Sequence, residues 1–390
     1  MKNGNGHIGF HLLGATNDVG VQRALAEFRT GRPIVLNGKG ERILALPVDG
    51  AHHDAMAAFK ALCRPAPLRL AITAKRAKAL DIEASGPVTI GLAADDAAES
   101  IMTLAADAFV DRKLTATPAA PVAVAAIELA KLAQRLPALL IGAADAALLA
   151  ALDPPLVDVE AAAVMRFRNN SLRSLAIASE AKVPLQDGVA TRFVVFRDGI
   201  GGSQTAIVVG EPDFSRPVLV RLHSACLTGD VFGSRRCDCG EQLKLALSRL
   251  KEADGGIILY LEQEGRGLGI ANKIRAYNLQ DQGLDTVDAN TTLGFEDDER
   301  DYRVAARMLE MLGCKRVFVL TNNPEKLEGL AEAGLEIAGR VPLYTPMNAD
   351  NQRYLTAKAT RAGHWLDGLL AQANETTTAD MPDAERAPPG

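Results

Sequence analysis

Three of the five cysteines of this chain lie in one short polar segment. Cys226, Cys237 and Cys239 fall within residues 221–243 (RLHSACLTGDVFGSRRCDCGEQL). Three thiols from one segment suit a tetrahedral zinc ion, and a catalytic zinc keeps its fourth position for water. His223 is an alternative fourth ligand and would make the zinc structural, whereas three reduced thiols packed in a core is the ordinary alternative. The charged neighbours of these cysteines favour the metal site.

Two further segments could bind or transform an anionic substrate. Residues 257–277 (IILYLEQEGRGLGIANKIRAY) place glycines 265, 267 and 269 around Arg266, between an expected strand and an expected helix. Backbone amides at such a turn favour anions, and an arginine can fork onto a phosphate. It is equally possible that these glycines only permit a tight connection between the strand and the helix, without binding an anion. Residues 293–303 (LGFEDDERDYR) are dense in charge ahead of an expected helix, where acidic residues often only complement the helix dipole.

The elements that must position these residues follow from apolar periodicity and turn residues. Strands are predicted over 192–197 and 205–209, joined as a hairpin by the glycine-rich turn at 199–202. Further strands are predicted over 218–222, 257–261 and 317–320, and helices over about 243–250, 271–282 and 304–312. Alanine-rich residues 118–153 predict helices and short strands interrupted at Pro137. This alternation predicts an α/β protein of two domains, with a carboxy-terminal α/β sandwich on a mixed sheet and an amino-terminal α/β domain.

Composition limits the class of protein. A chain of 390 residues exceeds what one core usually supports, so two domains are expected. The net charge of −5, without a long basic run, argues against a nucleic-acid polymer as partner. Five cysteines without framework spacing indicate reduced thiols, with Cys63 and Cys314 as ordinary buried ones. No leader or membrane span is expected, so the prediction is a cytoplasmic protein that ends in a disordered tail over 369–390.

Four motifs together resemble the GTP cyclohydrolase II family, in order and in spacing. They are residues 221–243, 260–295, 298–302 and 321–326 (TNNPEK), and the similarity covers about residues 192–366. Members of that family hydrolyse GTP to 2,5-diamino-6-hydroxy-4-(5-phosphoribosylamino)pyrimidine, formate and pyrophosphate in the first step of riboflavin biosynthesis. The resemblance therefore implies a hydrolase that acts on the cyclic amidine C–N bonds of GTP.

The resemblance also implies roles for single residues. Cys226, Cys237 and Cys239 would bind one zinc ion per subunit, which lowers the pKa of its water so that hydroxide can attack C8 of the guanine. Tyr277 matches a tyrosine near the base that could assist proton transfer, and Asp298 matches the proton acceptor. Arg300 matches the residue assigned as nucleophile towards the α-phosphate, although a guanidinium stays protonated and is equally credible as a transition-state clamp.

The substrate set carried over from the family is larger. Arg221, residues 264–266 and Lys326 would meet the triphosphate together with Mg²⁺, and Gln242, Thr286 and Thr321 would hydrogen-bond the nucleotide. The members of the whole set are Arg221, Leu222, His223, Ser224, Gln242, Glu264, Gly265, Arg266, Thr286, Thr321 and Lys326. Family members are typically homodimers, so a homodimer is expected.

Two positions depart from the family pattern and leave alternatives open. Ala225 stands where glutamate is usual, and Glu262 stands where arginine or a similar residue is common. Both bear on GTP affinity more than on reaction type. One alternative is a nucleotide-binding pseudoenzyme, and another is an enzyme that stops before deformylation.

The amino-terminal half carries a second resemblance. Residues 23–36 (RALAEFRTGRPIVL) are similar to the start of 3,4-dihydroxy-2-butanone 4-phosphate synthase, whose first strand is followed by acidic residues that hold Mg²⁺. Here that stretch is NGKGERILAL, residues 37–46, and a lone Glu41 cannot replace several carboxylates around a hard cation. We expect residues 1–190 to be a degenerate, inactive domain of that ancestry that serves as scaffold or dimer partner, followed by a GTP cyclohydrolase II domain over 191–368.

Overall fold

The computed structural model describes residues 15–366, apart from 64–65, 144–145, 254, 349–350, 352–355, 357–358 and 362. The expected tail over 369–390 lies outside the described residues. The chain divides into two compact units that alternate along the sequence. The first contains the residues up to Ala176 together with Arg197–Ser203 and Glu262–Arg300, and the second contains Ile177–Phe196, Gln204–Leu261 and the residues from Asp301 onward.

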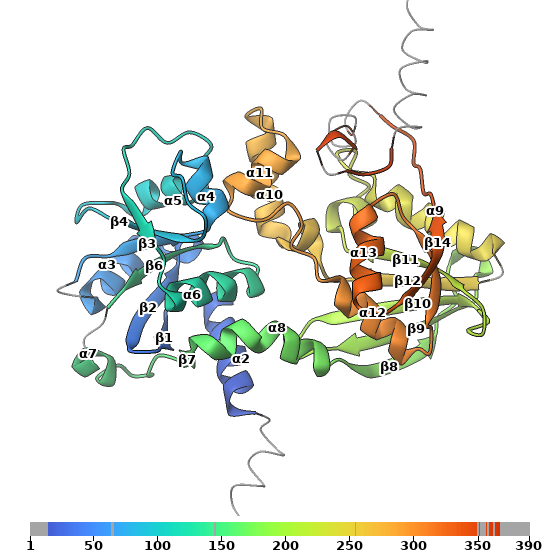
Figure 1. Ribbon diagram of the computed structural model, residues 1–390, viewed down its shortest axis with the longest axis horizontal. Helices are drawn as coiled ribbons and strands as arrows, with labels where there is room; N and C mark the ends of the chain where they lie inside the picture. Colours follow the sequence, from blue (N-terminus) through green and yellow to red (C-terminus); the bar gives the residue numbers. More distant parts are fainter. Residues whose placement is uncertain are drawn as a thin grey trace, which may run out of the picture. The chain divides into compact units, whose positions relative to one another are not determined.

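The first unit is built on a seven-stranded sheet with the order β5-β4-β3-β6-β2-β1-β7. Its pairs are antiparallel except β1 with β7, which are parallel. The strands, shown in Figure 1, are β1 (Ile34–Gly38), β2 (Glu41–Pro47), β3 (Arg69–Ile72), β4 (Val88–Gly91), β5 (Ala116–Pro118), β6 (Ala138–Gly142) and β7 (Asp158–Glu160).

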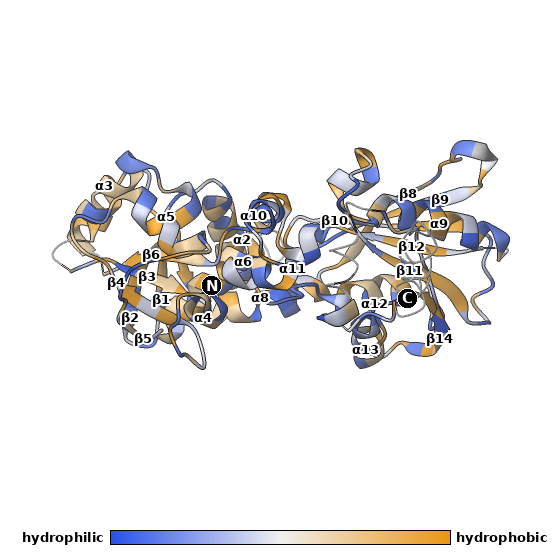
Figure 2. Cartoon of the chain, turned by 90° about the horizontal axis from the view of Figure 1, so that it is seen from above, coloured by the Kyte–Doolittle hydropathy of each residue, from blue (hydrophilic) through white to orange (hydrophobic). Residues whose placement is uncertain are grey.

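Side chains of this sheet alternate between two buried faces, as the two-residue period of a strand requires. In β6, Leu140 joins one apolar cluster, whereas Leu139 and Ile141 join the other. In β1, Val35 likewise faces away from Ile34 and Leu36. Figure 2 shows hydrophobic residues along these strands. Both faces must therefore be covered by helices.

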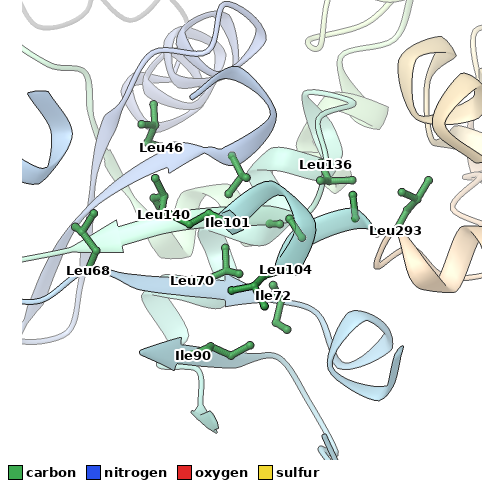
Figure 3. Close-up of a cluster of buried hydrophobic side chains, with 14 of the residues drawn as sticks. Leu46, Leu68, Leu70, Ile72, Ile90, Ile101, Leu104, Leu136, Leu140 and Leu293 are labelled. Atoms are coloured by element: carbon green, nitrogen blue, oxygen red, sulfur yellow. The ribbon is translucent and has the colours of Figure 1, made fainter. Parts of the chain in front are cut away.

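Helices α2, α6 and α8 cover one face, and α3, α4, α5, α10 and α11 supply the cluster on the other face. Part of that second cluster is drawn in Figure 3. The helical elements of this unit are α2 (Thr16–Arg29), η1 (Val48–Gly50), α3 (His53–Leu62), α4 (Ala74–Ala79), α5 (Ala98–Ala106), α6 (Pro121–Leu132), α7 (Ala146–Ala150), α8 (Ala161–Arg173), η4 (Glu264–Gly267), α10 (Ile270–Asp281) and α11 (Thr286–Thr292).

The second unit is built on a mixed seven-stranded sheet with the order β14-β13-β11-β12-β10-β9-β8. Its strands β11, β12, β13 and β14 are parallel to one another, and β10 runs antiparallel to β12. The strands are β8 (Ala176–Lys182), β9 (Thr191–Arg197), β10 (Ser203–Gly210), β11 (Val218–Ser224), β12 (Gly255–Leu261), β13 (Arg316–Leu320) and β14 (Glu336–Val341). Its helical elements are η2 (Gln186–Gly188), η3 (Leu227–Val231), α9 (Cys239–Glu252), α12 (Tyr302–Met311) and α13 (Pro324–Glu332).

The predicted fold class is confirmed, because both halves are α/β and the carboxy-terminal sheet is mixed. The predicted strands and helices of this half are present within a few residues of their expected bounds. Two details differ: β12 begins at Gly255 rather than at residue 257, and α9 begins at Cys239 rather than at about residue 243. The boundary at residues 190/191 stays a prediction. None of the helices in the described part of the chain combines the length and apolar character that crossing a membrane requires.

Candidate active site and metal centre

The cysteine segment lies at the carboxyl end of β11, where the connections of the sheet change direction. From β11 the chain passes through α9 to β12 on one side, whereas from β13 it passes through α13 to β14 on the other. Because β11 and β13 are parallel neighbours, their carboxyl ends flank a topological switch point, the usual ligand site of an open α/β sheet. Cys226 follows β11 and Thr321 follows β13.

The structure brings the three predicted thiols together. The sulfur atoms of Cys226, Cys237 and Cys239 lie within 4.8 Å of one another, with Cys226 Sγ and Cys237 Sγ 3.7 Å apart. Glycine at 229 is needed beside them, since a Cβ there would lie 2.9 Å from Cys237 Sγ and 3.0 Å from Cys226 Sγ. Its amide donates to Cys226 Sγ at 3.3 Å.

These thiols fit a zinc ion. Ligands placed tetrahedrally about 2.3 Å from zinc lie about 3.8 Å apart, which agrees with the separation of Cys226 Sγ and Cys237 Sγ. Hydrogen bonds to Cys226 and Cys237, followed by burial, raise the pKa of Cys239 well above its usual value. Crowded thiols therefore ionise poorly by themselves, and a bound cation would displace their protons.

Asp230 joins the cysteine turn, residues 226–239, to side chains of β11 and β12. No role was predicted for Asp230 from the sequence. Its carboxylate accepts from the Cys226 amide at 3.0 Å and from the Tyr260 hydroxyl at 2.9 Å. It also bonds His223 Nε2 at 3.1 Å, while the His223 ring stacks on Tyr260. Burial lowers the pKa of His223 against the opposing effect of Asp230. His223 lies outside the group of thiols, so the alternative of a fourth protein ligand gains no support.

The predicted substrate residues of the second unit are mostly buried and hydrogen-bonded at the same strand ends. Arg221 donates to the Leu320 carbonyl at 3.0 Å and to the Gln242 side chain. Gln242 in turn donates to Asp238, which stands between Cys237 and Cys239 in the sequence. Lys326 donates to the Leu222 carbonyl at 2.7 Å. A cationic set therefore shares this edge of the sheet with the thiols.

The remaining second-unit residues of the substrate set differ in exposure. Thr321 is buried and accepts from the Asn323 amide at 3.0 Å, which fixes the turn into α13. Ser224 ends β11 and is half-buried.

The glycine-rich segment of the first unit forms a tight turn between β12 and α10, as predicted. Gly265 and Arg266 both adopt left-handed conformations, with φ of 62° and 61°. A non-glycine residue held there is unusual and is often found at functional sites. The amides of residues 265 and 267–269 donate within the segment itself. These four amides therefore have partners within the turn, and contact of this segment with an anion stays a prediction.

Side chains of this segment are also paired. Arg266 donates to Asp297 Oδ1 at 2.9 Å, and Lys273 donates to Glu264 Oε1 at 2.9 Å. Lys273 Nζ also lies 5.8 Å from the centre of the Tyr277 ring on α10. Lys273 is 9% exposed and was not among the predicted site residues, since a lysine in a helical pattern gave no signal of this contact.

Asp298 and Arg300 form a forked ion pair. Arg300 Nε donates to both carboxylate oxygens of Asp298, at 2.8 and 3.0 Å, and Nη2 donates to Oδ2. The Arg300 amide also bonds Asp298 Oδ1 at 3.0 Å. Thr286 begins α11, after the helix cap made by Asp285. These residues belong to the first unit and the thiols to the second.

The two positions that depart from the family pattern have local partners. The Ala225 amide donates to the Leu261 carbonyl at 2.8 Å, which extends the pairing of β11 with β12. Glu262 Oε2 accepts from the Ser203 amide at 3.0 Å. Glu262 therefore contributes to holding the start of β10.

Comparisons with known proteins agree with the motifs. The GTP cyclohydrolase II family profile matches residues 176–342. A GTP cyclohydrolase-2 of Azospirillum brasilense is 41% identical over 359 residues, covering 88% of this chain and 93% of the relative. A GTP cyclohydrolase-2 of Azotobacter vinelandii is 47% identical over 205 residues, covering 53% of this chain and 99% of the relative.

One solved structure, a two-domain 3,4-dihydroxy-2-butanone 4-phosphate synthase from A. baumannii, aligns with 82% of this chain and 99% of that chain. Its 14% identity and TM-score of 0.32 are too low to bear on function. The Azospirillum relative, by contrast, is similar over nearly the whole of both chains. This chain therefore belongs to the GTP cyclohydrolase II family.

Proposed function

We propose that this protein is a zinc-dependent GTP cyclohydrolase II. It would hydrolyse GTP to 2,5-diamino-6-hydroxy-4-(5-phosphoribosylamino)pyrimidine, formate and pyrophosphate, the first step of riboflavin biosynthesis. The observation that carries this proposal is the group of three thiols at the switch point of the second sheet, beside Arg221 and Lys326. A structural zinc site alone would have no need of that cationic surrounding.

Cys226, Cys237 and Cys239 would hold the metal. A zinc ion with three thiolate ligands keeps one position for water and lowers the pKa of that water towards neutrality. Asp230 orients the cysteine turn through the Cys226 amide, as residues behind a metal ligand commonly do. Gly229 leaves the room that Cys226 Sγ, Cys237 Sγ and Cys239 Cβ occupy.

Arg221 and Lys326 would offset the charge of the triphosphate, together with a Mg²⁺ ion bound to the substrate. Their present partners include carbonyl and amide oxygens, which hold the cations in place without neutralising them. Gln242 and Thr321 would hydrogen-bond the nucleotide, with the backbone of residues 222–224 alongside. Their burial fixes them before substrate arrives, which limits the reorganisation that binding requires.

Residues 264–300 would supply the groups that act on the phosphates and on the opening ring. Asp298 would accept a proton, Tyr277 would assist proton transfer, and Glu264, Gly265, Arg266 and Thr286 would contact the nucleotide. Arg300 would stabilise charge at the α-phosphate. The fork that Arg300 makes with Asp298 supports this role, because a guanidinium that donates to a carboxylate has no lone pair for attack.

The amino-terminal half would contribute no synthase activity. The connection between β1 and β2 is short, and Glu41 is the one acidic residue within 37–46. Ribulose 5-phosphate and Mg²⁺ given to the full chain should yield no butanone phosphate above the rate without protein. Robust formation of that product would overturn this part of the proposal. A homodimer and a cytoplasmic location also stay predictions.

The experiment that tests the main proposal follows both products of GTP hydrolysis. Formate is assayed enzymatically, and the pyrimidine is identified by its mass. Release of formate with the diaminopyrimidine supports the proposal, binding of GTP without turnover indicates the pseudoenzyme, and a formylated product indicates arrest before deformylation.

A further inference from the structure

Residues 262–300 complete the helical layer of the amino-terminal sheet, although their motifs belong to the cyclohydrolase region. Leu268, Ala276, Leu279, Leu293 and Phe295 are each at most 4% exposed and share one apolar cluster with strands of the first sheet. Figure 3 shows Leu293 within this cluster, together with Leu136 and Leu104. The segment that carries Tyr277, Asp298 and Arg300 is therefore part of the core of the first unit.

A buried arginine of the amino-terminal half holds the end of α11. Arg76, on α4, is 1% exposed, and its guanidinium donates to the carbonyls of Thr103, Leu104 and Asp107 and to that of Thr292. These carbonyls lie at the carboxyl ends of α5 and α11, where helices leave oxygens unpaired and favour a cation. Arg76 therefore joins the two helix ends through one side chain.

The turn after α11 is fixed by the cap of α4. Thr73 donates to the Gly294 carbonyl at 2.7 Å and accepts from the Arg76 amide. Gly294 has φ of +87°, and a Cβ at this position would lie 3.0 Å from Thr73 Oγ1. The chain can make this close approach only with glycine, and it reaches Asp298 four residues later.

Lys131 holds the segment directly beside the catalytic candidates. Lys131, on α6, bonds Glu299 Oε1 at 2.5 Å, and both side chains are about 15% exposed. The same oxygen accepts from the Glu296 amide at 2.9 Å, and the Glu299 amide donates to the Arg266 carbonyl at 3.1 Å. Glu299 thus links the amino-terminal half to the Arg266 turn. Its two neighbours in the sequence are the catalytic candidates Asp298 and Arg300.

We propose that Lys131 is a positioning residue for GTP hydrolysis, through which the amino-terminal half of this chain supports residues 262–300. Lys131, through Glu299, fixes the segment that carries Asp298 and Arg300, with Arg76 and Thr73 anchoring its start. This inference rests on the proposed function and extends it, because it places residues that govern turnover outside the family motifs.

The test compares Lys131→Met with Lys39→Met, which removes an exposed lysine from the β1–β2 turn. Displacement of a reacting group by about 1 Å can cost about a hundredfold in rate. Lys131→Met should therefore lower kcat for GTP by about tenfold or more, with KM for GTP changed by less than about threefold. Lys39→Met should leave both values unchanged.

A charge exchange separates positioning from general destabilisation. Lys131→Glu and Glu299→Lys should each lower kcat. The double variant that combines them should recover most of the loss, because it restores the ion pair with the two charges interchanged. Hydrogen exchange of residues 286–300 should be faster in Lys131→Met than in wild type and unchanged in Lys39→Met. This readout does not depend on turnover.

The outcomes are distinguishable from failure of the proposed function. Wild-type protein that releases no formate from GTP refutes that function, whereas the hydrogen-exchange experiment still tests the contact between Lys131 and Glu299. Faster exchange at residues 286–300 with unchanged kcat in Lys131→Met overturns the positioning role alone. The positioning role is also overturned if hydrogen exchange at residues 286–300 is unchanged in Lys131→Met. It is overturned as well if the double variant, with Lys131→Glu and Glu299→Lys combined, is no more active than either single variant.

Discussion

The carboxylate of Asp230 accepts a hydrogen bond from the backbone amide of Cys226 at 3.0 Å. The same carboxylate holds Tyr260 and His223, both of which lie on strands of the second sheet. The cysteine turn is thereby fixed to the sheet by a residue that is not itself among the three thiols. We therefore expect the orientation of the proposed zinc ligands to depend on this contact.

Asp230→Asn should weaken zinc binding while leaving the fold intact. Loss of a hydrogen-bond partner behind a metal ligand typically costs about 10- to 100-fold in metal affinity. Competition with a chromophoric chelator measures the affinity, and Asp213→Asn, in an exposed turn of the same unit, is the matched control. Wild-type affinity in Asp230→Asn would show that the turn is held by other contacts.

His223 should make the protein less stable in mild acid. Burial lowers the folded-state pKa of His223 below its unfolded value of about 6.5. The unfolded state therefore binds more protons as the pH falls through about 6.5, and the free energy of unfolding decreases in that direction. Urea unfolding between about pH 5 and 8 should show a shallower pH dependence for His223→Gln than for wild type. Parallel curves for the two proteins would refute the assignment.

Arg300→Ala should abolish most turnover without preventing GTP binding. Removal of an arginine that clamps a phosphoryl transition state costs about 10³-fold or more in kcat. Arg303→Ala, which removes a half-exposed arginine paired with Asp301, is the control and should keep most activity. A covalent nucleotide adduct on Arg300, trapped by rapid quench in neutral denaturant because its P–N bond hydrolyses in acid, and found by mass spectrometry, would instead establish the nucleophile.

Arg76→Met should destabilise the first unit. The substitution leaves buried carbonyls at the ends of α5 and α11 without their shared donor. Each unsatisfied buried group costs about 1–3 kcal/mol, so the free energy of unfolding should fall by at least about 2 kcal/mol. Denaturant unfolding measures the change, and an unchanged midpoint would mean that the carbonyls find other partners.

The thiols and the strands around them could be predicted from sequence because their signals are local. Cys226, Cys237 and Cys239 share one segment, and the strand that precedes them is a short apolar run. Asp230 was visible among the charges there, but its contacts with His223 and Tyr260 depend on the pairing of β11 with β12. Strand pairing is a non-local property, which spacing along the chain does not reveal.

The environment of residues 262–300 could not be predicted for the same reason. Their motif spacing placed them with the carboxy-terminal half, whereas Leu268, Leu293 and Phe295 pack with the amino-terminal sheet. Lys131 and Glu299 are 168 residues apart, and neither stands out in its own segment. The internal use of the amides around Arg266 was also missed, because glycine content shows that a turn is tight without showing where its amides point.

The most direct test of the central claim is formate release from GTP by wild-type protein, by the same protein after chelation, and by Cys237→Ser. Metal content is measured on each sample, and Cys314→Ala, a buried thiol outside the group, is the control. We predict about one zinc per chain in wild type and Cys314→Ala, with formate release lost on chelation, restored by zinc, and absent in Cys237→Ser. Full activity in a metal-free sample, or in Cys237→Ser, would contradict the account.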